Sequence, residues 1–547
     1  MKNTDHKYLS ISLILLYSLL ILERLYGIGF LRWAFDEEQN FGGGTAMLKW
    51  GMNLFGADIA NPEMEHLVSI YGIVGKYLAV VPAAMGFALE KIFPIDLPIP
   101  LGLIFTRVFV SFLPSVLTIF LIHRIIRLVS DSKVFLFSTL MLFLFAFKHI
   151  ETAHYGVSDG LSTFFVVLST YYFLQFSIHE GGEKNNKYLM LTAIACMLAI
   201  STKINVGVII TATIGVFLLR NTWRTTLFQK NLGLFVFTST AAFLVINLPY
   251  LIYFEEWYAE LIRHIQEYPY TIKGTFLTPF YFHPPFGLSL AILLLALGGM
   301  WYGVLKSFGK KQWVSHGETV SQKTIASIFL PALLFLLLFY IYLAFSRGII
   351  HRWAIPMTPF LVLFAGYFME VSYQWALVRI PIIRHRLGGI CMALIVFFML
   401  GTESLYHVVQ FDLGLMASPS TYEKLQNFVD EHIPANTCIY NVEGIQLSHC
   451  SENAPESIEA LKESGIEYIV FSDFWFSERR YPSSILYLDV IDERTHGNWR
   501  LIRNHIEGNS DNWVLEEVIQ PAHYSYWSTN IAQPPIFYIY KLVEPES

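Results

Sequence analysis

The residues that first suggest chemistry are three consecutive carboxylates, Asp36, Glu37 and Glu38, which follow closely on the first apolar run of the chain. A carboxylate held beside a reacting hydroxyl group can accept its proton as the oxygen attacks. Charge close to a membrane is costly unless it is solvated or used. The stretch is therefore a candidate for general-base catalysis, and a solvated loop that merely ends a helix is the alternative.

A second polar cluster lies between two apolar segments, at residues 149–160. It contains two imidazoles and two carboxylates, of which His154 and Asp159 are the candidates for binding a substrate. A divalent metal is a candidate cofactor, but the spacing of these side chains does not identify a metal site. Asp159 opens an apolar segment, where it could cap a helix or face a cavity shared with Asp36.

Several cations stand on the side of the membrane where lysine and arginine are usually rare. Lipid headgroup phosphates are one explanation for outward-facing cations at this depth, and a phosphate-bearing lipid bound in a cavity is the other. Together with the carboxylates, these cations favour transfer of a group from a phospholipid carrier, because they would stabilise charge on a departing phosphate. The cations are Arg107, Lys203, Arg347, His351 and Arg352.

The composition indicates that membrane-spanning helices position these residues. Hydrophobic residues make up 54% of the 547 residues and charged residues only 15%, whereas soluble domains carry about a quarter charged residues. The mean hydropathy is +0.47. A soluble core could not hide so much apolar surface, but lipid can. No basic run interleaved with aromatic residues occurs, which excludes nucleic acid as a partner.

Charge placement predicts an all-α polytopic bundle of about eleven spans. Segment 9–29 lacks a cleavage site and is interpreted as a retained first span. With a cytoplasmic N-terminus, most basic residues fall on the cytoplasmic side, provided that 68–92 lies in the outer interface and does not cross. The predicted spans are 9–29, 101–122, 133–150, 156–178, 188–202, 204–220, 231–253, 286–306, 325–346, 351–373 and 387–409.

The chain changes character near residue 418, where charged residues, Asn, Ser and Pro become frequent. We therefore predict a transmembrane domain over 1–410 and an extracytoplasmic soluble α/β domain over 418–547. If that compartment is oxidising, Cys438 and Cys450 can form a disulfide. The predicted elements are helices at 421–432 and 455–464 and strands at 438–442, 467–471, 514–519 and 536–542.

Several motifs resemble those of one enzyme family. The stretch 35–42, with Asp-Glu followed by Phe-Gly, is similar to the Asp-Glu motif in the first external loop of the protein O-mannosyltransferases. Related motifs occur in the lipid A aminoarabinose transferases, and the tail resembles the variable soluble domains of prokaryotic members. Further similarity, in the same order along 1–410, covers 106–118, 158–159, 201–205 and 352–356.

The resemblance implies the GT-C fold in a multi-pass protein of the plasma or inner membrane. It implies an inverting transfer of a sugar from a polyprenyl-phosphate carrier to a hydroxyl group of a protein, lipid or glycan. In that picture Asp36 is the general base and Glu37 assists or orients it. Arg107, Lys203 and Arg352 would contact the donor phosphate, His154 and Asp159 would position the acceptor or a metal, and Arg347 and His351 complete the substrate-binding set.

Two departures remove support for mannose as the sugar. Phe41-Gly42 comes one position later than in the mannosyltransferases, and their first-loop His-Pro-Pro is absent from 65–68 and occurs instead at 283–285. A secondary transporter is one alternative function, which predicts charges buried mid-bilayer on broken helices. The others are an oligosaccharide ligase or polymerase that uses a diphosphate-linked glycan, and a lipid-binding scaffold in which Asp36 is dispensable.

Overall fold

The computed structural model divides into two compact units, Met1–His264 with Gly274–Val408, and Ile265–Lys273 with Val409–Ser547. The structure describes residues 2–26, 28, 37–54, 72–93, 100–178, 183–220, 226–267, 288–308, 314–315, 318–319, 322–345, 351–380, 397, 401–411, 413, 421–434, 437, 439–441, 451–452, 467–472, 513–520 and 537–542.

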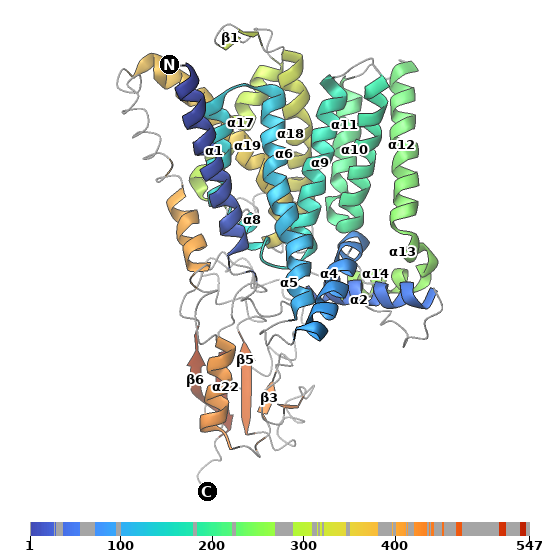
Figure 1. Ribbon diagram of the computed structural model, residues 1–547, viewed down its shortest axis with the longest axis vertical. Coiled ribbons are helices and arrows are strands. Elements are labelled where there is room, and N and C mark those ends of the chain that lie inside the picture. The colour runs from blue at the N-terminus through green and yellow to red at the C-terminus, as the bar shows by residue number, and fades with distance from the viewer. Residues whose placement is uncertain are drawn as a thin grey trace. The chain divides into compact units, whose positions relative to one another are not determined.

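The first unit is a bundle of helices that run side by side (Figure 1). The predicted apolar segments between residues 9 and 373 all coincide with described helices, because apolar runs of this length satisfy their backbone groups only within a helix. The main helices are α1 (Lys2–Leu25), α6 (Leu113–Val129), α9 (Ser158–Ile178), α10 (Glu183–Thr202), α11 (Val208–Arg220), α12 (Thr226–Ile246), α17 (Leu290–Phe308), α18 (Gln322–Phe345) and α19 (Thr358–Arg379).

The bundle has the helices of an integral membrane protein. Five helices in the described part are long and apolar enough to cross a membrane, and a bent pair would make a sixth. Large apolar side chains face outward, such as Phe237, which is 73% exposed, and Trp301, which is 67% exposed. Lipid accommodates such exposed apolar surface, which supports the membrane assignment. The count of eleven spans stays a prediction. The five are Ile73–Ile92, Leu101–Val129, Ser158–Ile178, Gln229–Ile246 and Ala354–Arg379.

Two spans are interrupted, and both interruptions adjoin predicted site residues. The first consists of α5 (Leu101–Arg107), a π-helical turn η1 (Val108–Phe112) and α6. The second runs from α7 (Lys133–Leu142) through the 3₁₀ turn η2 (Phe143–Phe145) to α8 (Phe147–Glu151), and its two halves meet at 68°. Such irregular turns often occur at functional sites, because they re-aim side chains.

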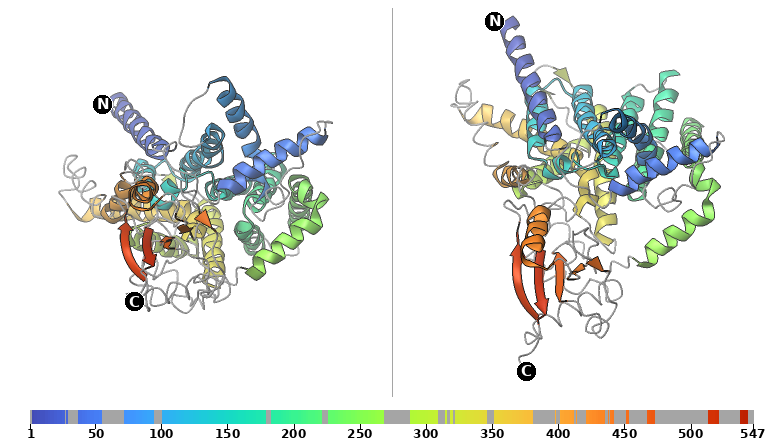
Figure 2. Two further views of the ribbon diagram at one scale, coloured as in Figure 1. Left: turned by 90° about the horizontal axis from the view of Figure 1, so that it is seen from below. Right: turned by 60° about the horizontal axis from the view of Figure 1, so that its bottom comes forward.

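Helices α2 (Glu37–Leu54) and α14 (Phe254–Glu267) occupy stretches that we expected to be loops. Both lie at the same end of the bundle, and α2 runs across the direction of α6, α9 and α10 (Figures 1 and 2). Trp50 of α2 donates to the Tyr253 hydroxyl at 3.0 Å, next to the start of α14. Three successive glycines in α2 oppose helix formation, which is why we expected a loop there. Tertiary packing explains why the stretch is a helix.

Helix α4 (Ile73–Ile92) lies within the predicted segment 68–92. It packs closely on α2, since a Cβ added at Gly44 would come within 2.8 Å of the Ala79 Cβ. It also passes α5, where a Cβ at Gly86 would lie 2.1 Å from the Gly102 Cα. Glycine at these positions permits backbones to approach, which joins α2, α4 and α5 in one layer. Helix α4 is long and apolar enough to cross a membrane, and the expectation that it lies in the outer interface stays a prediction.

The second unit contains a five-stranded mixed sheet in the order β4-β3-β5-β7-β6. Strand β3 pairs in parallel with β4 and with β5, and β7 pairs antiparallel with β5 and β6. The predicted helix 421–432 is confirmed as α22 (Thr421–His432), whose Leu425 and Val429 are buried with Ile439 and Ile539 of the sheet. The strands are β3 (Ile439–Asn441), β4 (Ser451–Glu452), β5 (Tyr468–Ser472), β6 (Trp513–Ile519) and β7 (Phe537–Leu542).

Three of the four strand predictions match β5, β6 and β7 to within one residue at each end, and the fourth contains β3. Strand β4 was not predicted, because two residues carry no readable period. The predicted helix 455–464 and the cysteines Cys438 and Cys450 lie outside the described residues, so the disulfide and the soluble extracytoplasmic domain stay predictions.

Candidate active site

An ion pair between Asp159 and Lys203 is the centre of the polar cluster at one end of the bundle. The Lys203 ammonium donates to Asp159 Oδ1, which brings together the first turn of α9 and the residue that follows α10. The Asp159 side chain is 4% exposed and the Lys203 side chain 15% exposed. The ion pair is therefore largely removed from water, but the Lys203 ammonium is exposed enough to contact a bound molecule.

Asn40, in the first turn of α2, ties the acidic stretch to this pair. Its side-chain amide donates to the Gly156 carbonyl at 2.7 Å, and its Oδ1 accepts from the Ser158 hydroxyl at 3.1 Å. Ser158 is the residue directly before Asp159. Because Glu37 is the first residue of α2, the carboxylate-rich stretch is joined to the Asp159 end of α9.

Arg107 is fully buried at the point where α5 passes into the π-helical turn. Its Nη1 donates to the Ile28 carbonyl at 2.9 Å, in the segment that connects α1 to the acidic stretch. From the same turn, the Ser111 hydroxyl donates to the Val157 carbonyl at 2.9 Å. The interrupted span thus contacts both the segment after α1 and the turn before Asp159.

Helix α4 closes the cluster from another side. A Cβ added at Gly72 would come within 2.2 Å of the carbonyl oxygens of Ser201 and Thr202, and one at Gly75 would lie 2.3 Å from Asn40 Oδ1. Gly72 requires glycine because its backbone contacts the backbone of the turn before Lys203, and a side chain at Gly75 would displace Asn40 from its contacts. The turn is held further by Asn247, whose amide donates to Ser201 at 2.7 Å.

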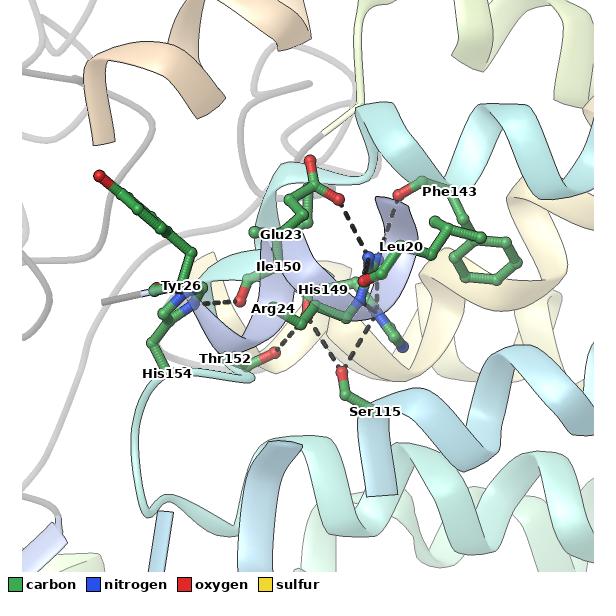
Figure 3. Close-up of polar contacts among 10 residues, drawn as sticks. All are labelled: Leu20, Glu23, Arg24, Tyr26, Ser115, Phe143, His149, Ile150, Thr152 and His154. Atoms are coloured by element: carbon green, nitrogen blue, oxygen red, sulfur yellow. Dashed lines mark hydrogen bonds and ion pairs between the residues drawn. The ribbon is translucent and has the colours of Figure 1, made fainter. Parts of the chain in front are cut away.

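Both ring nitrogens of His154 lie within hydrogen-bond distance of backbone carbonyl oxygens (Figure 3). Its Nε2 lies 2.7 Å from the Tyr26 carbonyl and its Nδ1 lies 2.8 Å from the Ile150 carbonyl. A metal would need one of these nitrogens as a lone-pair donor, and both face carbonyl oxygens. The geometry therefore supports a role in joining the end of α1 to the turn 150–154 more than a role in binding a metal.

The remaining predicted site residues are described only in part. Asp36 and Arg347 lie outside the described residues, as do the side chains of Glu37, His351 and Arg352. The backbone of His351 and Arg352 begins the 3₁₀ turn η4 (His351–Met357), which packs against α9. Asp159 lies in the first turn of α9, so the late motif and the second acidic motif occupy neighbouring elements.

Two features of the cluster were not anticipated from the sequence. Lys76 of α4 is fully buried, and its ammonium donates to the Tyr250 hydroxyl at 3.1 Å. A lysine inside an apolar run was the available signal, since such a charge needs a partner. The second feature is the fully buried Arg24, whose Nε donates to His149 Nδ1 at 3.4 Å. Among the described residues, no group of three or more His, Cys, Asp or Glu is arranged to hold a metal ion.

The chain resembles a known protein family in one sequence segment. Residues 100–263 match the family described as dolichyl-phosphate-mannose-protein mannosyltransferase. This segment includes Arg107, His154, Asp159 and Lys203. No curated protein sequence matches the chain.

Two solved structures show a loose similarity. ArnT from Cupriavidus metallidurans bound to undecaprenyl phosphate is 11% identical, with a TM-score of 0.46 over 96% of this chain and 98% of that one. An oligosaccharyltransferase from Archaeoglobus fulgidus in complex with zinc and sulfate is 12% identical, with a TM-score of 0.49 over 85% of this chain and 69% of that one. The resemblance predicted from the motifs is confirmed by the sequence match: over residues 100–263 the chain is similar to the dolichyl-phosphate-mannose-protein mannosyltransferases.

Proposed function

We propose that the protein is a membrane glycosyltransferase that moves a sugar from a polyprenyl-phosphate carrier to an acceptor hydroxyl group on the extracytoplasmic side. The observation that carries the proposal is the junction of α2, α9 and the end of α10, where Ser158 is hydrogen-bonded to Asn40 and the adjacent Asp159 is paired with Lys203. It brings together three motifs that are far apart in the sequence. The family match over 100–263 supports the same reaction class.

The proposed reaction is a single displacement at the anomeric carbon of the sugar. The acceptor oxygen attacks while its proton passes to the carboxylate of Asp36, with Glu37 orienting that group. The bond between the anomeric carbon and the phosphate oxygen breaks, and its electron pair stays on the phosphate. One displacement inverts the configuration at the anomeric carbon.

Lys203 and Arg107 are proposed to stabilise the charge on the departing phosphate. An ammonium group has three N–H donors, so Lys203 can keep its bond to Asp159 and still donate to a phosphate oxygen. In this arrangement Asp159 orients the Lys203 ammonium towards the phosphate. Asp159 is also proposed to contact the acceptor substrate, as its motif predicts. His351 and Arg352, which begin the 3₁₀ turn that packs on α9, are proposed to complete the phosphate site together with Arg347.

The remaining assignments concern location and partners. The distribution of Lys and Arg favours a site that faces away from the cytoplasm. The region 418–547 is proposed as an extracytoplasmic domain, and the acceptor is a hydroxyl group of a protein, lipid or glycan. A divalent metal stays a candidate cofactor.

Transfer of radiolabelled sugar from polyprenyl phosphate tests the proposal. We expect wild-type membranes to transfer label, and Asp36→Asn to lose transfer by about 10²–10⁴-fold at equal expression, the usual contribution of a general base. Asp131→Asn is the matched control, because that carboxylate is 89% exposed and lies 4.0 Å from Arg127 in the loop after α6.

Two outcomes would contradict these assignments. If Asp36→Asn transfers as well as wild type, Asp36 is not the base. If wild type transfers nothing from a panel of polyprenyl-phosphate sugars and acceptors, the glycosyltransferase proposal fails.

One observation favours a secondary transporter as the second candidate. The span broken at Ala146 carries the buried pair Lys148 and Glu151 directly after the break, and transporters use charges on broken helices. Substrate-coupled proton or sodium flux in proteoliposomes would support this candidate, particularly if Glu151→Gln abolished it. Sugar transfer by wild type without such flux would reject it.

A further inference from the structure

Arg24 is a fully buried arginine in the last turn of α1 (Figure 3). Its Nη1 donates to the Leu20 carbonyl at 3.0 Å and to the Glu23 carboxylate at 3.1 Å. Its Nη2 donates to the Phe143 carbonyl at 3.1 Å. A buried charge is expensive unless it is paired and hydrogen-bonded, so these contacts hold the side chain in one place.

The same guanidinium fixes the ring of His149. Arg24 Nη2 and Nε lie 3.3 Å and 3.4 Å from His149 Nδ1. Since arginine only donates, Nδ1 must accept, which puts the ring proton on Nε2. The Ser115 hydroxyl lies 3.2 Å from the His149 carbonyl and 3.3 Å from Nδ1. His149 is therefore held between α1 and α6 as a neutral acceptor.

These contacts span the bend in the second interrupted helix. Phe143 lies before the break at Ala146 and His149 lies after it, and the two halves meet at 68°. Arg24 bonds to both sides of the break. The His154 ring adds a third tie, through the Tyr26 carbonyl at 2.7 Å. The end of α1 is thus hydrogen-bonded to the bend and to the turn that follows it.

We propose that Arg24 is a positioning residue for sugar transfer, which fixes the bend and thereby the spacing between two parts of the site. The first part is the carboxylate-rich stretch that α1 leads into. The second is the Asp159–Lys203 pair that the bend leads into. The inference rests on the proposed function. A misplacement of about 1 Å in such an arrangement costs on the order of 10²-fold in rate.

The test measures kcat and KM for a polyprenyl-phosphate sugar in purified, detergent-solubilised protein. We expect Arg24→Met to lower kcat by about 10²-fold and to change KM by no more than about threefold, because groups are misplaced while the phosphate contacts remain. Arg24→Lys keeps the charge but replaces three nitrogens by one, so it cannot keep the Nη1 contacts together with the Nη2 contacts, and we expect it to recover less than about a tenth of the lost rate. Ser115→Ala is a milder variant that should fold if Arg24→Met does not.

A double-mutant cycle tests whether Arg24 acts through His149. We expect Arg24→Met with His149→Leu to lower kcat no more than the worse single variant, since residues that act as a unit are not additive. Arg127→Met is the matched control, because this partly exposed arginine lies at the other end of α6 and pairs with Asp131. Additive losses in the cycle, or a KM that rises as much as kcat falls, would overturn the proposal.

Hydrogen–deuterium exchange provides a readout that does not need activity. Peptides covering 20–28 and 143–157 should lose protection together in Arg24→Met, and neither should in Arg127→Met. Loss of protection in 20–28 alone would show that Arg24 does not fix the bend. A wild type that transfers no sugar would overturn the proposed function, and the exchange experiment would still decide whether Arg24 couples α1 to the bend.

Discussion

Two buried ion pairs of the bundle differ in how they are built. Lys148 and Glu151 are three residues apart in one short helix, their N–O distance is 2.8 Å, and their side chains are 0% and 1% exposed. Asp159 and Lys203 come from α9 and the end of α10, and the lysine is 15% exposed. The first pair is closed and local, whereas the second joins separate elements and stays partly accessible.

The difference in exposure indicates that the two ion pairs have separate roles. A fully enclosed pair contributes mainly through the penalty of breaking it, because a lone charge would remain buried. A partly accessible pair can exchange or share its hydrogen bonds with a bound molecule. We therefore infer that Lys148–Glu151 stabilises the turn after the bend and that Asp159–Lys203 binds substrate.

The largest expected effect is on stability, from Lys148→Met. It leaves the Glu151 carboxylate buried without its ammonium partner, which should lower the free energy of unfolding by about 3–5 kcal/mol. Thermal unfolding in detergent measures this loss. The double variant Lys148→Met/Glu151→Leu should recover most of it, because no charge is then left unpaired. A single variant as stable as wild type would show that the pair is not enclosed.

Lys203→Met should affect activity more than stability. We expect kcat/KM for the polyprenyl-phosphate sugar to fall by about 10²-fold, which corresponds to about 2.7 kcal/mol of lost transition-state stabilisation. The unfolding temperature should fall less than in Lys148→Met, because water can reach the position that the partly exposed lysine leaves and can solvate the Asp159 carboxylate. Lys203→Arg is the conservative control, and it should retain more activity than Lys203→Met. If Lys203→Met unfolds as readily as Lys148→Met, the two pairs do not differ in role.

The smallest expected effect comes from Asn40→Ala, which removes the link between α2 and the Asp159 turn. Two hydrogen bonds are lost, each with a net contribution of about 1 kcal/mol, so kcat should fall by at most about thirtyfold. Asn40→Asp keeps the acceptor for Ser158 and loses the donor to Gly156, and should lie between wild type and Asn40→Ala. Transfer assays under saturating donor measure the difference. Unchanged kcat in both variants would show that α2 does not depend on this link.

Much of the fold was predictable because apolar runs and charge placement are local properties of the chain. The helices of the bundle and the strands β3, β5, β6 and β7 fall where the sequence predicts them. Helix α2 was missed because its glycines disfavour a helix, and only packing against α4 and α5 compensates. Helix α14 was missed because it lies in a polar stretch between spans, where we expected a loop.

The site was predictable by residue type but not by partner. Arg107 and Lys203 were singled out because Lys and Arg are usually rare on the outer side of the membrane, and Asp159 because it opens an apolar segment. Their contacts were not readable: Lys203 pairs with Asp159, and Arg107 donates to the Ile28 carbonyl. Arg24 was passed over, since an arginine at the end of a span is ordinarily a flanking charge.

The sequence by itself determined that the chain is helical, suited to a membrane and similar to the mannosyltransferase family over part of its length, because composition, hydropathy and motif order need no partner to be recognised. Tertiary structure alone decided which charges meet. Asp159 and Lys203 are 44 residues apart, and Arg24 and His149 are 125 apart. Contacts between residues this distant depend on how helices pack and bend, and no local pattern encodes that packing.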